Sequence, residues 1–279
     1  LLNTPATLAS GSCTTLTVER RNLGGTPVTA AGAINVTLST SADGGTVDIV
    51  GNTGSCRARP LASNALQIAA GASSTVVSIR GTRVGQVSLS ATSMPLTAAA
   101  ATTQVTPGDA SNLTMDSLSA PSFTAGACVP FTVRMTDVNG NLAGNVPANT
   151  QLTLFGTSSG SLAPQFFTDA TCATAISAPI TATQVVTTLY FRPRSVTAAG
   201  GTTVSAAASN LSGNPQVSFA VTAGAGTQVV ITSSAFSAIP VNGCQAGTWG
   251  VVDAFGNATA APAGGLAYTL SSTSATASF

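Results

Sequence analysis

The stretch FTVRMTDVNGN, residues 131–141, combines an alternating strand with a turn that follows it directly. Phe131, Val133 and Met135 are apolar at every second position, which is the pattern of a strand with one buried face. The turn begins at Asp137, whose side chain can cap it, and its fourth residue is a glycine, which adopts a positive φ without strain. This strand-and-turn unit predicts a β-sheet protein.

The same unit recurs along the chain. The turn reads DVNGN at 137–141, DAFGN 116 residues later at 253–257, and NLGGT 115 residues earlier at 22–26. The five cysteines recur at the same interval: Cys13, Cys128 and Cys244 are 115 or 116 residues apart, as are Cys56 and Cys172. Within a copy, the second cysteine follows the first by 43 or 44 residues. A fixed interval of this length indicates an array of one repeated domain.

We therefore expect three copies, over residues 1–107, 108–223 and 224–279, with the first strand of the first copy clipped and the third copy truncated. Each copy is expected to have six or seven short strands, because turn signals come every 8–15 residues and no segment has the period of a helix. The predicted fold class is all-β, with tandem β-sandwiches. The linkers, at 106–109 and 222–226, are too short to let neighbouring sandwiches wander, which favours a semi-rigid rod.

Each cysteine pair is expected to form one internal disulfide, Cys13 with Cys56 and Cys128 with Cys172. The spacing places the partner of Cys244 at residue 287 or 288, past the end of this sequence. Regular pairs are typical of an oxidising compartment, outside the cell or in a periplasm. Metal binding by the cysteines is the weaker alternative, because the sequence has no histidine and no CxxC spacing.

The stretch 131–141, the apolar strand after it and the motif AGGTTVSA at 199–206 resemble the bacterial Ig-like domains of invasin- and intimin-type surface proteins. The turn Asp-x-x-Gly-Asn stands again at 253–257, whereas the first copy departs from it with Asn22 and Thr26. The resemblance implies Ig-like sandwiches and an extracellular stalk, adhesin or filament component.

Charged residues make up 6% of the chain, the net charge is +1, all nine basic residues are arginines, and Glu19 is the one glutamate. This composition does not support binding to nucleic acid or anionic lipid. No run of 18 apolar residues that could span a membrane is present in the sequence. An uncharged surface of this kind favours self-association, so the expected partners are neighbouring modules or copies of the chain.

Catalysis is not expected, because a chain without histidine or lysine cannot assemble a Ser/His/Asp or Ser/Lys arrangement. No cofactor is expected either. The best metal candidate is the alternation of Asp137, Asn139 and Asn141, which resembles a calcium loop, although a plain β-turn is the favoured interpretation. Calcium between modules near Asp109 stays open. The single tryptophan, Trp249, is expected in the core, because it aligns with apolar strand positions; an exposed sugar-binding aromatic is the alternative.

These observations predict a structural repeat segment of an extracellular bacterial surface protein or filament. A module that carries its own recognition site for a host, cell-surface or glycan ligand is the alternative, and it predicts exposed aromatics or a groove confined to one copy. A third hypothesis makes the modules spacers for an enzyme encoded beyond this sequence.

Overall fold

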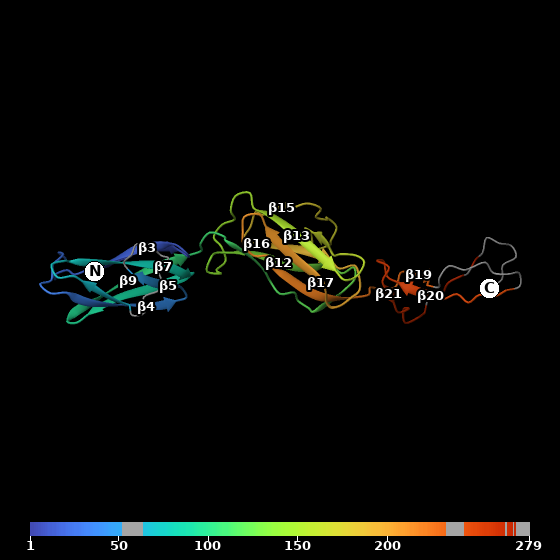
Figure 1. The fold of residues 1–279 in the computed structure, drawn as a ribbon, viewed down its shortest axis with the longest axis horizontal. Coiled ribbons are helices and arrows are strands. Elements are labelled where there is room, and N and C mark those ends of the chain that lie inside the picture. The colour runs from blue at the N-terminus through green and yellow to red at the C-terminus, as the bar shows by residue number, and fades with distance from the viewer. Residues whose placement is uncertain (52–63, 233–242, 266, 270, 272–279) are drawn as a thin grey trace.

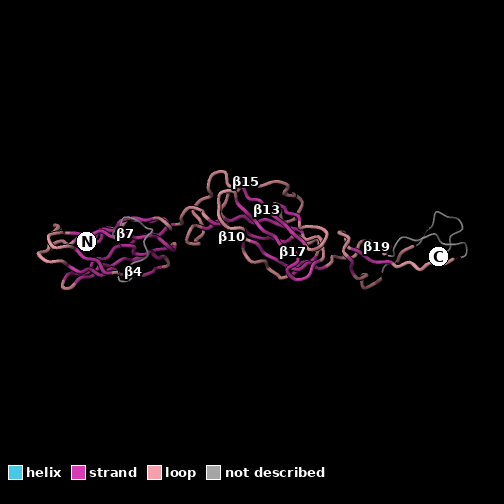
Figure 2. Tube along the Cα trace, in the orientation of Figure 1, coloured by secondary structure: helices cyan, strands magenta, loops and turns pink. Residues whose placement is uncertain are grey.

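The computed structural model describes residues 1–51, 64–232, 243–265, 267–269 and 271. All the regular secondary structure in these ranges is β-strand, and no helix occurs there (Figure 2). The all-β prediction is therefore confirmed. Cys56 lies outside the described residues.

The first sandwich consists of two sheets formed within residues 2–106. One sheet has the order β1 (Leu2–Asn3), β3 (Cys13–Glu19), β7 (Ser74–Arg83) and β5 (Thr46–Gly51). The other has the order β2 (Thr7–Ala9), β9 (Leu96–Thr106), β8 (Gly85–Ser93), β4 (Ile34–Asp43) and β6 (Ala65–Ile68). Neighbouring strands are antiparallel except for β2 and β9, which run parallel.

The second sandwich repeats this arrangement within residues 112–222. Its first sheet has the order β10 (Asn112–Met115), β12 (Val129–Thr136), β16 (Val186–Arg192) and β14 (Gln165–Phe167). Its second sheet has the order β11 (Ser122–Thr124), β18 (Gln216–Thr222), β17 (Thr197–Ala208), β13 (Gln151–Ser158) and β15 (Ile180–Thr181). When the strands are matched in chain order, the two sandwiches have the same sheet orders, including the parallel pair of β11 and β18.

In the described residues each sandwich has nine strands, rather than the six or seven that the turn signals predict. The additional strands are short pieces at the sheet edges, such as β2, β6, β14 and β15, which have two to four residues each. A strand of that length has too few positions for an alternating pattern to be visible.

The alternating apolar residues meet between the two sheets of each sandwich. In the first sandwich, Leu16 and Ile79 from one sheet and Leu38 and Leu89 from the other are almost completely buried in one cluster. In the second sandwich the corresponding layer is aromatic, and Phe191 lies at its centre with its ring 4.9 Å from that of Phe219. Full burial of such side chains contributes about 1.5–3 kcal/mol each.

A third, smaller sheet follows the second sandwich and consists of β19 (Gln228–Ile231), β20 (Trp249–Val252) and β21 (Ala258–Thr259). The two sandwiches and this sheet follow one another along the long axis of the molecule, with the N-terminus in the first sandwich (Figure 1). The polypeptide passes from one to the next through residues 107–111 and 223–227, which lie between strands. The turns at 137–141 and 253–257 make contacts at these two crossings.

Candidate functional site at the joints

The turn at 137–141 closes on itself through backbone hydrogen bonds. The amide of Asp137 donates to the carbonyl of Asn141 (2.8 Å), and the amide of Gly140 donates to the carbonyl of Asp137 (3.0 Å). Gly140 has a φ of 82°, which only glycine adopts without strain. The β-turn interpretation of this motif is therefore confirmed, and Asp137 and Gly140 have the roles expected of them.

The carboxylate of Asp137 is completely buried and attaches the linker to the turn. It accepts hydrogen bonds from the amides of Asn139 (2.9 Å) and Asn141 (3.0 Å) within the turn, and from the amide of Gly108 in the linker (3.2 Å). Burial of the carboxyl opposes its ionisation, but the hydrogen bonds from Asn141, Ser10 and these amides outweigh burial and hold the pKa of Asp137 below its usual value of 3.8.

Asn141, the last residue of the turn, crosses to the first sandwich. Its Nδ2 donates to the carbonyl of Thr82 (2.9 Å), while its Oδ1 accepts the amide of Val84 (3.3 Å). The Oγ of Ser10 lies 2.9 Å from the Nδ2 atoms of both Asn139 and Asn141. We call this set of contacts joint 1. In joint 1 the Asn141 side chain of the second sandwich binds both a carbonyl and an amide of the first sandwich's main chain.

Joint 2 repeats these contacts between the second sandwich and the third sheet. Asp253 accepts the amide of linker residue Gly224 (2.8 Å). The Nδ2 of Asn257 donates to the carbonyl of Arg194 (2.7 Å), and its Oδ1 accepts the amide of Val196 (2.9 Å). Burial again opposes ionisation, but hydrogen bonds from Asn257 and the neighbouring amides keep the pKa of Asp253 below 3.8.

Glycine permits the close approach of the units at both joints. A Cβ on Gly11 would lie 2.7 Å from Cγ1 of Val138, and a Cβ on Gly126 would lie 3.0 Å from Cε2 of Phe255. Both glycines have positive φ, 80° and 89°. Each stands two residues before the first cysteine of its copy, so the sequence held a signal for this position that the strand pattern did not use.

The turn at 22–26 in the first sandwich has the same backbone bonds but different side chains. The amide of Asn22 donates to the carbonyl of Thr26 (2.9 Å), and that of Gly25 donates to the carbonyl of Asn22 (2.9 Å). Asn22 stands in place of the aspartate and Thr26 in place of the asparagine. Leu23, at the tip, is fully exposed.

The calcium alternative for Asp137, Asn139 and Asn141 is not supported by the arrangement of donors. The carboxylate faces backbone and side-chain N–H groups, which would have to be displaced before a cation could bind. Among the described residues no group of three or more acidic or cysteine side chains is suitably placed for a metal ion.

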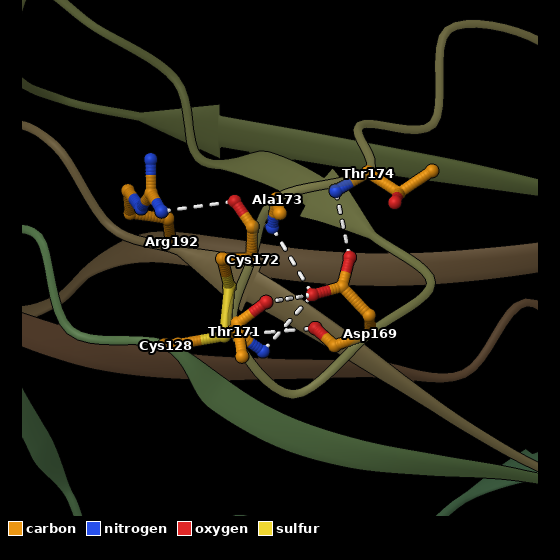
Figure 3. Close-up of a disulfide and its surroundings, with 7 residues drawn as sticks. All are labelled: Cys128, Asp169, Thr171, Cys172, Ala173, Thr174 and Arg192. Carbon is orange, nitrogen blue, oxygen red and sulfur yellow. Dashed lines mark hydrogen bonds between the residues drawn. A yellow bond between two sulfur atoms is a disulfide. The ribbon is translucent and has the colours of Figure 1, made fainter.

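Cys128 and Cys172 form the expected disulfide, with their Cα atoms 5.8 Å apart (Figure 3). Cys128 precedes β12, and Cys172 lies in the loop that follows β14. Asp169 organises this loop, because its carboxylate accepts hydrogen bonds from Thr171, Ala173 and Thr174. The Thr171 hydroxyl and these amides hold the pKa of Asp169 well below its usual value.

Arg192, the last residue of β16, connects this loop to the sheet. The Arg192 guanidinium donates to the carbonyl of Cys172 (3.0 Å; Figure 3). It also lies 4.8 Å from the centre of the Phe167 ring. Cys244 is exposed and has a free thiol. The pairing of Cys13 with Cys56 stays a prediction because Cys56 is outside the described residues.

The expectation that Trp249 is a core residue is wrong. Trp249 is 40% exposed, and its ring lies 5.8 Å from that of Tyr268, which is also exposed. The aligned position in the second sandwich, Val133, is 2% exposed because the facing sheet covers it. In the described part of the chain, β20 belongs to a single sheet of three strands, so the same alternation leaves its apolar side chain uncovered.

No known protein-family profile matches the chain, and no curated protein matches it. Solved structures that it resembles include bacterial surface proteins. Domains 4–9 of the surface layer protein SbsC align at 16% identity and a TM-score of 0.28, over 84% of this chain and 33% of that one. The Escherichia coli adhesin FdeC aligns at 14% identity and a TM-score of 0.36, over 91% and 73% of the two chains.

The Yersinia pseudotuberculosis adhesin InvE aligns at 19% identity and a TM-score of 0.27, over 77% of this chain and 56% of that one. The chain spans about a third of the SbsC structure. In the residues that the structure describes, no helix has the length and apolar character needed to cross a membrane.

Proposed function

We propose that the chain is a structural segment of an extracellular rod, in which tandem Ig-like sandwiches are held end to end by the turn Asp-x-x-Gly-Asn. The observation that carries this proposal is the recurrence of one joint. Asp137 and Asp253 each hold a linker glycine, and Asn141 and Asn257 each bind the carbonyl and amide of two main-chain residues in the preceding unit. Such a two-point contact restrains bending as well as separation.

The mechanism is mechanical. The buried core of each sandwich resists extension, and a linker held by a buried carboxylate passes force to the next unit. The disulfide prevents the loop between Cys128 and Cys172 from extending, even after the strands around it separate. The disulfide also supports placement in an oxidising compartment outside the cytoplasm. The proposal places the domain boundaries at 107/108 and 223/224. It also makes neighbouring units the binding partners of each domain.

The test is the solution shape of the non-reduced chain, measured by small-angle X-ray scattering and negative-stain electron microscopy. We expect straight particles whose scattering fits a single orientation of the two sandwiches. A broad distribution of angles at residues 107–111 would contradict the proposal, because the joint would then not restrain the units.

A second candidate function, binding of a glycan, has one observation in its favour. Trp249 and Tyr268 form an exposed aromatic pair in the last unit, and stacked aromatics can bind the apolar faces of sugars. A glycan array with the native chain and the Trp249→Ala variant tests this function. Binding that the substitution abolishes would support it, and a native chain that binds no glycan would exclude it for the array's ligands.

A further inference from the structure

The two joints share their aspartate and asparagine but differ in the residues around them. In joint 1, Ser10 precedes the close-approach glycine, and the turn opposite carries Val138 and Asn139. In joint 2, the corresponding residue is Ala125, and the turn carries Ala254 and Phe255. Between the two joints, the residue before the glycine and the third residue of the facing turn therefore differ together.

Joint 1 has a polar centre. Ser10 is 5% exposed, and its hydroxyl lies 3.3 Å from the carbonyl of Thr82 and 2.9 Å from the Nδ2 of Asn139. The same Nδ2 lies 3.3 Å from the carbonyl of Gly81. A hydroxyl oxygen has two lone pairs that can accept hydrogen bonds, and the Nδ2 groups of Asn139 and Asn141 both lie within reach of this one.

Joint 2 has an apolar centre. Ala125 is 7% exposed and belongs to the core of the second sandwich, and Phe255 of the next unit packs against that same core. A Cβ on Gly126 would lie 3.0 Å from Cε2 of this ring. Residue 125 carries no hydroxyl, so the ring packs against this core without leaving a polar side chain of residue 125 unpaired.

We propose that the residue before the close-approach glycine and the third residue of the turn form a matched pair that determines which units dock onto each other. Ser10 is matched to Asn139, and Ala125 is matched to Phe255. Exchange of one member places a ring against a buried hydroxyl, or leaves an amide without its acceptor, and either costs free energy that the native pair does not. The order of units along the rod is then encoded at the joints.

This inference deepens the proposed function and rests on it, because both depend on the joints. The experiment uses the whole chain and three variants at joint 1: S10A, the turn exchange V138A/N139F, and the two combined. The exchange rate of the Val84 amide hydrogen is measured by NMR, because this amide donates across the joint to Asn141, which every variant keeps.

Each mismatched variant is expected to raise the Val84 exchange rate about three- to tenfold, the effect of roughly one net hydrogen bond. The combined variant recreates the pair of joint 2 and should return to within about twofold of the native rate. The amide of Leu89 in the core of the first sandwich is the control and should not change. The mirror set, A125S and A254V/F255N, is read at Val196 in case a joint 1 variant unfolds.

Effects that simply add in the combined variant, at both joints, would overturn the matched pair while leaving the rod intact. Unprotected Val84 and Val196 amides in the native chain would overturn both the pair and the proposed rod. Rescue at either joint, with protection in the native chain, supports both.

Discussion

Replacing Asn141 with alanine removes the side chain that holds the second sandwich to the first. The variant loses the hydrogen bond from Nδ2 to the carbonyl of Thr82 (2.9 Å) and the one that Oδ1 accepts from the amide of Val84 (3.3 Å). It also loses the contact of Nδ2 with the hydroxyl of Ser10 (2.9 Å). The contact between Asn139 and Ser10 remains, as does the bond between Asp137 and Gly108. The units stay tethered, but the two-point contact is gone.

The magnitude follows from the two bonds to the main chain. Each is partly buried and contributes about 0.5–1.5 kcal/mol net, so the closed joint should lose at least about 2 kcal/mol relative to the open one. This corresponds to a change of roughly 30-fold in the equilibrium between closed and open joints. A joint that is almost always closed in the native chain would then be open for a measurable fraction of the time.

Residual dipolar couplings of backbone amides provide the assay, because they report the relative orientation of two bodies. The native chain is expected to fit one alignment tensor over both sandwiches, whereas Asn141→Ala should need two, with smaller couplings in one of them. Thr26→Ala is the matched control, since Thr26 occupies the same turn position in the first sandwich and is exposed. If Asn141→Ala still fits a single tensor as well as the native chain does, the asparagine does not hold the joint.

Three further predictions concern the sandwiches and the pH range of the joint. Replacing Cys128 and Cys172 with serine should lower the free energy of unfolding of the second sandwich by about 4 kcal/mol, because the closed loop is long; chemical denaturation measures this, and a serine at Cys244 should have no effect. Phe191→Ala should cost the same sandwich about 3–5 kcal/mol, since the ring is fully buried; a differential scan in which the first sandwich melts as before supports this, and an unchanged second transition contradicts it. Because the pKa of Asp137 is lowered in the folded chain, its stabilisation of joint 1 is complete above the usual value of 3.8 and is lost as pH falls through the lowered pKa; scattering curves should stay constant from pH 8 to about pH 5 and show bending only below about pH 4, and bending that begins near neutrality would contradict this assignment.

The strands and the turn at 137–141 could be predicted because they depend on local patterns. Alternation along 131–135 determines which face is buried, and the cysteine interval fixes the register between copies. The contacts that the turn at 137–141 makes with the first sandwich could not be predicted in the same way. Its partners at Thr82 and Val84 are main-chain atoms, and any residue type supplies those.

The burial of Trp249 could not be predicted from local sequence patterns either. The position of Trp249 within its strand has the phase of a core residue, but phase says only which side of a sheet a residue faces. Whether that side is covered depends on a second sheet, formed in the complete sandwiches by strands far away in the sequence.

A joint made each time by the same bonds also fixes the twist from one unit to the next. If every step along the rod turns by the same angle, a given side face returns to the same direction at a regular distance, as the thread of a screw does. Two such rods lying side by side would bring the same faces into contact only when they are shifted along their axes by whole multiples of that distance. Asn141 and Asn257 bind only their own turn and the unit before it, yet they would then set the spacing at which neighbouring rods pack.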